Sequence, residues 1–373
     1  MIYLFATESY YPENNGVSLV VQNLAKYLTE HNNHVNVVTG NIHENLHYHD
    51  NVNIFHFNVI GNASTQYQGE IDNYINFVIN FKCDYLILEC TQIWSTDLIL
   101  SNLDLCEAKK IILHSHDFSY FKYKPKNPIK ILKWVNYYKG IYKYIRKLDW
   151  VFVLNSELKD AHWLNSRNIQ YSVLENGVEE SFFCKPTKYE IRNVQNEYGL
   201  DYNQDIYICV ANYEILKDQE LVLTSFIESN IDAQLVFIGN NKNKYSEKLS
   251  KIIKKHKLDN NIKLLSNVSR DIIRILLWGS KAFLYGSKVE AVPLVILEAI
   301  VTRTPFISTN VGSVGSFRSG IISKKPSEMA TDIKILHQNS SLYLELLSNT
   351  ETERNRFHWE NITIDLQRKL LII

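Results

Sequence analysis

Short apolar runs alternate with amphipathic stretches along most of the chain, the pattern of an α/β protein. The clearest example lies between Lys281 and Ser316. An apolar run at Lys281–Tyr285 predicts a buried strand, an apolar helix begins at Pro293, and Pro305–Thr309 predicts a second strand. A strand, a helix and a strand in this order predict a βαβ unit of a parallel sheet.

The N-terminal segment repeats this arrangement. Ile2–Ala6 predicts a buried strand in the middle of a parallel sheet, Val17–Leu28 has helical periodicity, and Val35–Thr39 returns as a strand. The intervening Tyr10–Gly16 contains Pro, Asn and Gly, the residues of turns. The sequence therefore predicts a loop that lies over a helix N-terminus.

Other apolar runs extend the pattern over both halves of the chain. Strands are predicted at Asp84–Leu88, Lys110–Leu113, Trp150–Leu154, Ile206–Val210, Gln234–Gly239 and Ile262–Leu265. A chain of 373 residues is too long for one ordinary core and suits two domains.

Candidate chemistry lies where the helix at Pro293 begins. Proline suits the first helical position, and the backbone N–H groups of Leu294, Val295 and Ile296 are then expected to be unpaired. Together with the helix dipole, they predict an anion site suited to a diphosphate.

Two glutamates flank this anion site. Glu290 lies in the loop before the helix and Glu298 about one turn into it, and helical side chains lean toward the N-terminus. Carboxylates accept hydrogen bonds from hydroxyl groups, so a diphosphate between them indicates a sugar nucleotide. The alternative is that one glutamate pairs with a lysine and the other is solvated.

The segment VEAVPLVILEA, followed by TPFISTNVGS, resembles the signature of glycosyltransferase family 4, retaining enzymes of GT-B fold. The resemblance implies an α/β protein with two Rossmann-like domains facing across a cleft: residues 1–180 on the acceptor side and 181–355 binding the nucleotide-sugar. The tail FHWENITIDLQRKL resembles the terminal helix that crosses back to the first domain, here residues 356–373. The SVLENGV segment resembles the turn that leaves the first domain.

The same resemblance assigns roles to individual residues. Glu290 would contact the donor sugar and Glu298 the nucleotide ribose, with the backbone around Val292, Pro293, Leu294 and Val295 holding the sugar and phosphates. Lys217 would neutralise the departing phosphate, and His116 would face the donor sugar. Gly16 and Gly239 match loop and strand-end glycines of the donor site.

Two positions depart from the family pattern. Asn212 stands where the family has an arginine, and Phe317 lies in a region where the family often has a glutamate. Because asparagine is a neutral donor, stabilisation of the leaving group would rest more on Lys217 and on helix N-termini.

The segment Phe118–Leu148 contains nine basic residues and no acidic one, interleaved with aromatic residues. After Pro128 its periodicity is helical, and basic amphipathic helices with Trp and Tyr bind anionic membrane surfaces. The predicted membrane or acceptor surface comprises Lys130, Lys133, Trp134, Lys139, Lys143, Arg146 and Lys147. A solvated lysine face and, less favoured, RNA binding are the alternatives.

Composition narrows the remaining possibilities. The formal net charge is zero, so no global field favours nucleic acid. Five cysteines without C-x-x-C spacing indicate a reducing compartment. The histidines His43, His47 and His49 lack the accompanying Cys or carboxylate residues of a metal site. No signal peptide or spanning helix is expected.

We therefore predict a retaining, metal-independent glycosyltransferase without a cofactor. It would transfer a sugar from a UDP- or GDP-sugar to a hydroxyl of a glycan or lipid-linked acceptor. The expected setting is lipopolysaccharide, capsule or other polysaccharide assembly, with the protein cytoplasmic and peripheral to the inner face of the cell membrane. The alternatives are another GT-B enzyme, such as a sugar-nucleotide epimerase, and a catalytically silent GT-B scaffold subunit, which the Asn212 and Phe317 departures motivate.

Overall fold

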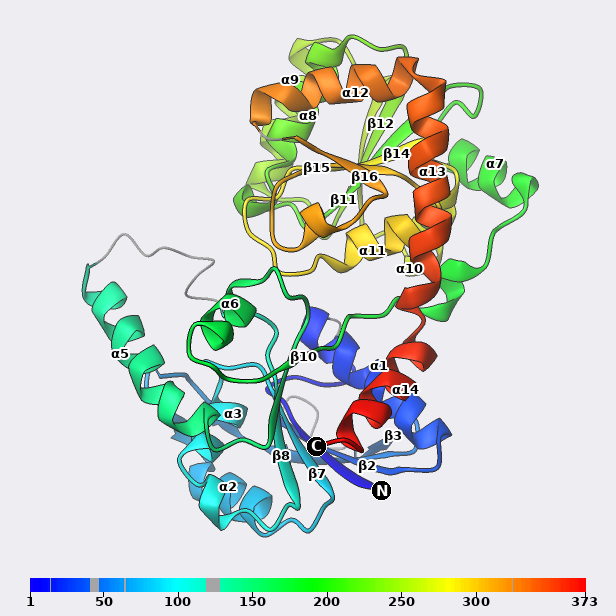
Figure 1. The fold of residues 1–373 in the computed structure, drawn as a ribbon. Coiled ribbons are helices and arrows are strands. Elements are labelled where there is room, and N and C mark those ends of the chain that lie inside the picture. Colours follow the sequence, from blue (N-terminus) through cyan, green and yellow to red (C-terminus); the bar gives the residue numbers. More distant parts are fainter. Residues whose placement is uncertain (14, 41–46, 64, 119–127, 324) are drawn as a thin grey trace. The chain divides into compact units, whose positions relative to one another are not determined.

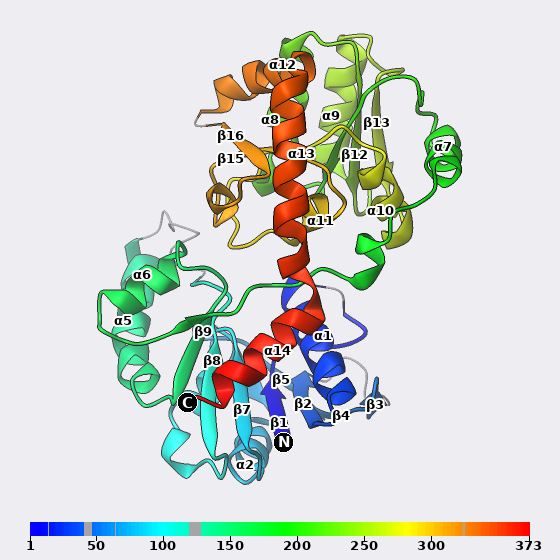
Figure 2. The same cartoon turned by 45° about the vertical axis from the view of Figure 1, so that its right-hand side comes forward.

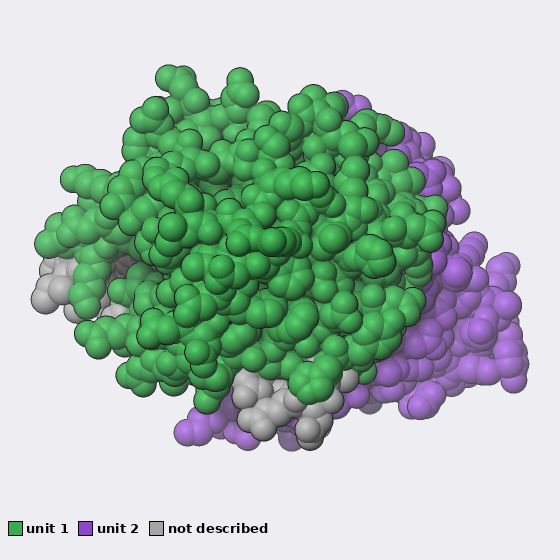
Figure 3. All heavy atoms as spheres, turned by 90° about the horizontal axis from the view of Figure 1, so that it is seen from below, with its two compact units in different colours: residues 1–176, 359–373 green, residues 177–358 purple. Residues whose placement is uncertain are grey.

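The computed structural model describes residues 1–13, 15–40, 47–63, 65–118, 128–323 and 325–373. The chain forms two compact units, each with its own parallel sheet. Unit 1 comprises residues 1–176 and 359–373, and unit 2 comprises residues 177–358 (Figure 3). The prediction of two Rossmann-like domains with a C-terminal helix returning to the first is confirmed.

Unit 1 contains an eight-stranded sheet in the order β10-β9-β8-β7-β1-β2-β4-β3, parallel except for the short β3 (Figure 1). Its strands are β1 Ile2–Ala6, β2 His34–Gly40, β3 Tyr48–His49, β4 Val52–Phe57, β7 Tyr85–Glu89, β8 Lys110–His114, β9 Trp150–Val153 and β10 Ser172–Val173. A separate small hairpin joins β5 Val59–Ile60 to β6 Gln68–Gly69. Its helices are α1 Gly16–Glu30, α2 Ile71–Ile79, α3 Trp94–Leu100, α5 Pro128–Ile145, α6 Lys159–Asn165 and α14 Trp359–Leu370.

Alternation along the central strand β1 divides the core of unit 1 into two layers. Leu4 and Ala6 lie in a cluster with residues of α2, α3, α5 and α6, whereas Tyr3 and Phe5 lie in a cluster with α1 and α14. The C-terminal helix α14 packs on α1, and the Tyr85 hydroxyl donates to the Leu370 carbonyl at 3.2 Å. Burial on both faces explains why β1 is apolar along its length.

Unit 2 contains a six-stranded parallel sheet in the order β13-β12-β11-β14-β15-β16 (Figure 2). Its strands are β11 Ile206–Val210, β12 Gln234–Gly239, β13 Ile262–Ser266, β14 Ala282–Tyr285, β15 Phe306–Thr309 and β16 Gly320–Ser323. Its helices are α7 Lys188–Glu197, α8 Gln219–Ser229, α9 Lys244–Lys255, α10 Arg270–Trp278, α11 Leu294–Val301, α12 Met329–Gln338 and α13 Ser340–Arg354. Here α7, α10 and α11 cover one face, while α8, α9 and α12 cover the other.

Both sheets contain one point where the strand order reverses. In unit 2 the chain runs outward from β11 through β12 to β13, then returns to β14 and runs outward the other way. In unit 1 the same reversal lies between β1 and β7. Open α/β sheets bind ligands at the carboxyl ends of the strands at such a point. In the part of the chain that is described, no helix has both the length and the apolar character needed to cross a bilayer.

Candidate functional site

Lys217 and Glu290 meet at the reversal point of unit 2. Lys217 ends a short 3-10 turn after β11, and Glu290 follows β14. The Lys217 Nζ lies 2.5 Å from Glu290 Oε1. Both side chains are mostly buried, with exposed fractions of 27% and 15%. The sequence thus placed a cation and a carboxylate at neighbouring strand ends, and the fold joins them.

Two more donors fix the Glu290 carboxylate. The Tyr285 hydroxyl donates to Glu290 Oε1 at 2.6 Å, and the Ser287 hydroxyl donates to the same oxygen at 2.9 Å. Burial and then the charge of Glu290 raise the pKa of Tyr285 well above its usual value, so its hydroxyl stays protonated. Neither Tyr285 nor Ser287 was anticipated as a site residue, although both lie within five residues of Glu290.

Glycines allow the loops of this site to approach one another. Gly312 has φ +55°, and a Cβ there would lie 2.0 Å from the Ala291 carbonyl oxygen. A Cβ on Gly286 would lie 2.7 Å from the Asp218 carbonyl oxygen. Asp218 itself has φ +46°, a left-handed conformation that Asp tolerates better than most residues. Only glycine at position 312 therefore permits the close contact with the loop that carries Glu290.

The entrance of α11 differs in one detail from the prediction. Pro293 is the residue before the helix, with ψ 115°, and the helix begins at Leu294. The expectation that the Ile296 N–H is unpaired was wrong, because it donates to the Pro293 carbonyl at 3.0 Å. Leu294 and Val295, the first two helical residues, have no intrahelical acceptor for their N–H groups. The predicted anion site would therefore consist of these two amides and the helix dipole.

Glu298 projects from α11 and is almost completely buried, with a side chain 4% exposed. Its Oε1 accepts a hydrogen bond from Arg270 Nη2 at 2.7 Å. Its Oε2 is buried and has no hydrogen-bond partner among the described residues. A buried carboxylate oxygen without a partner is costly, and this oxygen can still accept a hydrogen bond. Arg270 follows the helix cap Ser269 and gave no sign of this role in the sequence.

Three other predicted donor residues occupy different settings. Asn212 is exposed, and its carbonyl accepts from the Gln219 amide at 2.7 Å. Gly239 lies under the Tyr213 ring, since a Cβ there would be 2.5 Å from that ring. In unit 1, Gly16 is the exposed first residue of α1, and a Cβ there would meet no atom within 4 Å.

His116 in unit 1 belongs to a buried cluster with His114 and Glu89. His116 Nε2 lies 2.7 Å and His114 Nδ1 3.1 Å from Glu89 Oε2, at the ends of β7 and β8. Burial alone would raise the pKa of Glu89, but the two imidazoles outweigh it and lower the pKa to about 2. The ligand atoms of these three residues lie within 4.8 Å of one another, close enough to hold a metal ion. Glu89 ends an otherwise apolar strand and was missed in the sequence.

The basic segment forms α5, as its periodicity predicted. Lys133, Lys139, Lys143, Arg146 and Lys147 are exposed. Lys147 pairs with Asp104. The side chains of Lys130 and Trp134 lie outside what the structure describes.

One face of α5 packs into the core of unit 1. Tyr138 is buried there together with the aliphatic Ile141 and Ile145. Tyr137 donates to Asp97 at 2.6 Å. Part of the aromatic content of this helix is therefore structural.

The family model for glycosyl transferases group 1 matches residues 190–345, a range that contains all the unit 2 residues described above. N-acetyl-alpha-D-glucosaminyl L-malate synthase of Bacillus anthracis is 25% identical over 164 residues, which cover 43% of this chain and 41% of that protein. The uncharacterized glycosyltransferase MJ1059 of Methanocaldococcus jannaschii is 24% identical over 250 residues, covering 61% of this chain and 59% of that protein. The matched regions thus span only about half the length of these relatives.

Solved structures resemble the whole chain. A glycosyltransferase from Rickettsia africae has a TM-score of 0.78 at 18% identity, covering 99% of this chain and 98% of that chain. Anabaena HepE in complex with UDP-glucose has a TM-score of 0.75 at 14% identity, with 100% of both chains covered. WaaG, a glycosyltransferase involved in lipopolysaccharide biosynthesis, has a TM-score of 0.69 at 13% identity, with 98% of both chains covered.

At these identities the structural likeness establishes the fold, which is GT-B. The family model for glycosyl transferases group 1, also known as glycosyltransferase family 4, matches residues 190–345, a range that lies within unit 2. The resemblance stated from the sequence is thereby confirmed.

Proposed function

We propose that this protein transfers a glycosyl group from a nucleotide-sugar to an acceptor hydroxyl with retention of configuration. The observation that carries the proposal is the Glu298 carboxylate, whose Oε1 is held by Arg270 while its buried Oε2 has no partner. A ribose hydroxyl would supply the missing donor. The HepE structure in complex with UDP-glucose supports a UDP-sugar as the donor.

In this reaction the bond between the anomeric carbon and the diphosphate oxygen breaks, and a bond to the acceptor oxygen forms on the same face. Lys217 and the amides of Leu294 and Val295 would stabilise the negative charge that develops on the diphosphate. The acceptor proton would pass to the departing phosphate oxygen. Lys217 is paired with Glu290, so donor binding would turn Glu290 toward sugar hydroxyls and Lys217 toward phosphate.

Thermal-shift titration with UDP-, GDP- and ADP-sugars tests the proposal. A bound donor at about 100 times its Kd stabilises the protein by about 2.7 kcal/mol. We expect at least one of these nucleotide-sugars to raise the melting temperature. The Glu298→Gln variant should bind that nucleotide-sugar at least tenfold more weakly. The exposed Glu197→Gln, also in unit 2, is the matched control. No shift with any nucleotide-sugar would contradict the proposal.

The acceptor side of the proposal concerns the exposed lysines of α5. Lys133, Lys139 and Lys143 would dock the protein on an anionic membrane surface, each contributing about 1 kcal/mol near such a surface. The docked enzyme would then be close to glycan or lipid-linked acceptors at the inner membrane face, as in polysaccharide assembly.

Flotation with phosphatidylglycerol vesicles measures this docking. Replacement of the three lysines by Gln should abolish binding. Replacement of Lys251, Lys254 and Lys255, exposed on α9, removes the same charge and should not. Equal binding of both triple variants would refute the membrane role and favour an enzyme that needs no lipid surface, such as an epimerase.

The exposed, neutral Asn212 and the buried Phe317 are the two departures from the family pattern that favour a silent scaffold subunit. Donor hydrolysis or transfer by the wild-type chain that is lost in Glu298→Ala would eliminate that alternative.

A further inference from the structure

Three potential metal ligands meet at the carboxyl ends of the neighbouring strands β7 and β8 in unit 1 (Figure 1). Glu89 is the last residue of β7 and His114 the last residue of β8, and the two are paired in the register of these parallel strands. Side chains of residues in register project from the same face of a sheet. His116 follows His114 by two positions, and the centroids of the two rings are 4.3 Å apart. The fold therefore brings one carboxylate and two imidazoles together at one edge of the sheet.

The ligand atoms of this Glu89–His114–His116 cluster are close enough to share one ion. His116 Nε2 lies 2.7 Å and His114 Nδ1 3.1 Å from Glu89 Oε2, and the ligand atoms all lie within 4.8 Å of one another. Zinc binds nitrogen and oxygen at about 2.0–2.2 Å, which sets neighbouring ligand atoms about 3–3.5 Å apart. Small side-chain movements would therefore suffice to surround an ion.

Unpartnered polar atoms distinguish this cluster from an ordinary buried ion pair. Glu89 is fully buried and His114 is 1% exposed. Glu89 Oε1 and both ring nitrogens of His114 have no hydrogen-bond partner among the described residues. His114 Nδ1 is near Glu89 Oε2, yet this oxygen lies off the direction of a hydrogen bond from the ring. Burial of such groups without partners is costly, and a shared cation would satisfy a ring nitrogen and the carboxylate together.

Hydrogen bonds fix the backbone that carries these ligands. The Cys90 N–H donates to the His114 carbonyl at 2.9 Å and so joins the two strand ends directly. The Thr96 hydroxyl donates to the Glu89 carbonyl at 2.9 Å. A site whose ligands are held in place before the ion arrives loses little conformational entropy on binding.

The donor set selects the class of ion. Two imidazoles and one carboxylate suit Zn²⁺ and similar divalent transition metals, whereas Ca²⁺ and Mg²⁺ prefer sites built from oxygen ligands. The set contains no sulfur, which disfavours Cu⁺. Three protein ligands would leave a further coordination position for water. His116 is the one member of the cluster that is not fully buried, so it marks the side from which an ion would enter.

We infer that Glu89, His114 and His116 bind one divalent transition metal ion of the zinc class. An ion there would replace the hydrogen bond between His116 Nε2 and Glu89, and the proton of this nitrogen would be released to solvent. The inference does not depend on the proposed glycosyl transfer. The ion would lie in unit 1, whereas Lys217 and the first amides of α11, in unit 2, would stabilise the leaving group without a metal.

Isothermal titration calorimetry with ZnCl2 on the chelator-treated full chain, without a histidine tag, tests the site. We expect one equivalent of Zn²⁺ to bind, and MgCl2 to give no binding heat at the same concentrations. Loss of a hydrogen-bond partner behind a metal ligand already costs about 10–100-fold in affinity, so Glu89→Gln and His114→Gln should each weaken Zn²⁺ binding by about 100-fold or more. Replacement of His43, His47 and His49 by Gln removes another histidine group of unit 1 and is the matched control. This control should bind Zn²⁺ as the wild type does.

X-ray absorption at the zinc edge of the loaded wild-type chain gives a readout that does not depend on how the variants fold. We expect two imidazoles and oxygen ligands around the zinc, and no sulfur. The inference would be overturned if the wild type bound no stoichiometric Zn²⁺, or if the zinc had sulfur or fewer than two imidazoles as ligands. Unchanged affinity in Glu89→Gln, with the fold checked by circular dichroism, would overturn it as well. So would binding that is lost in the triple histidine control and kept in His114→Gln, because the ion would then be held elsewhere.

Discussion

Lys217 and Glu290 are 73 positions apart in the chain and form an ion pair with a 2.5 Å separation between Nζ and Oε1. Each follows one of the two strands, β11 and β14, that flank the reversal point of the second sheet. Under the proposed function, the pair holds a cation ready for the diphosphate of the donor.

Replacement of Lys217 tests its role in leaving-group stabilisation. Lys217→Met should lower the rate of transfer by about 10²–10³-fold, the typical loss when one preorganised donor to a developing anion is removed. Steady-state kinetics with the donor identified by thermal shift give this value. Lys248→Met, which removes an exposed lysine paired with Glu220, should leave the rate unchanged. Equal rates for both variants would show that Lys217 takes no part.

Removal of Arg270 should destabilise the protein through Glu298. Arg270→Met leaves a nearly buried carboxylate without its cation, and the loss should be about 2 kcal/mol. This value is below that of a fully buried pair because Arg270 is half exposed. Urea denaturation measures it, with Arg192→Met on the surface of α7 as the control. The double variant with Glu298→Gln should recover part of the loss, and a purely additive result would show that the two residues are not coupled.

Gly312 and Gly140 should respond oppositely to alanine. At Gly312 a Cβ would collide with the Ala291 carbonyl at φ +55°, so Gly312→Ala should lose at least about 2 kcal/mol and weaken donor binding. At Gly140, inside α5, a Cβ meets nothing within 4 Å, so Gly140→Ala should gain about 0.5–1 kcal/mol. Thermal denaturation of both variants checks the signs. A stable Gly312→Ala protein with normal donor affinity would refute the close loop contact.

The Glu89 cluster predicts a dependence of stability on pH. The pKa of Glu89 is lowered from 4.5 to about 2, so its ionised form stabilises the fold above pH 4.5. This contribution of about 3 kcal/mol is lost as the pH falls from about 4.5 to about 2. Glu89→Gln should flatten the dependence of urea midpoints on pH in this window. Glu360→Gln, exposed on α14, should retain the wild-type slope. An unchanged slope in Glu89→Gln would contradict the prediction.

Thr39→Val should stabilise the protein. Removal of an unpaired buried hydroxyl should raise stability by roughly 1 kcal/mol. Thr96→Val is the matched comparison: Thr96 is equally buried, but its Oγ1 donates to the Glu89 carbonyl at 2.9 Å. Thermal denaturation should therefore show a higher midpoint for Thr39→Val and a lower one for Thr96→Val. Destabilisation by Thr39→Val would mean that its hydroxyl has a partner within the protein.

Most of the fold was predictable because it depends on local patterns. The uniformly apolar runs at β1, β11 and β14 belong to strands buried on both faces, which leave no polar alternation. The helix that begins next to Pro293 follows from proline geometry and the apolar run after it, although the boundary lies one residue later than predicted.

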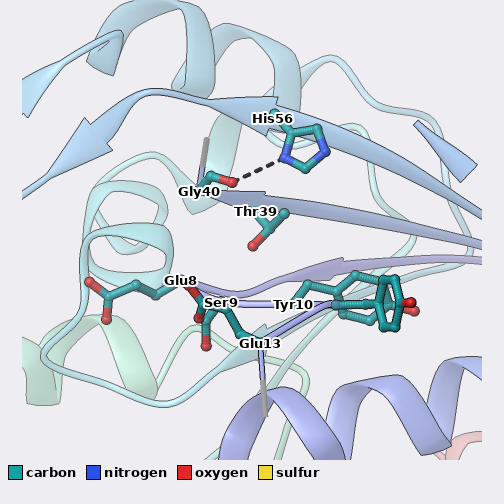
Figure 4. A pocket seen from close by; sticks show the side chains of 8 residues that line it. Glu8, Ser9, Tyr10, Glu13, Thr39, Gly40 and His56 are labelled. Carbon is teal, nitrogen blue, oxygen red and sulfur yellow. Dashed lines mark hydrogen bonds between the residues drawn. The ribbon is translucent and has the colours of Figure 1, made fainter. Parts of the chain in front are cut away.

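The sequence by itself determined the two series of βαβ units, the two strand ends carrying Lys217 and Glu290, and the helix entrance beside Glu298, because spacing along one segment is enough for each. Only the tertiary structure decided that Lys217 pairs with Glu290, that Arg270 holds Glu298, and that Glu89 lies between two histidines. These contacts depend on the order of strands in each sheet, and strand order is set by long-range packing. The burial of the Thr39 hydroxyl was also decided by the tertiary structure, because it depends on the approach of the end of β2 to the segment that follows β1 (Figure 4).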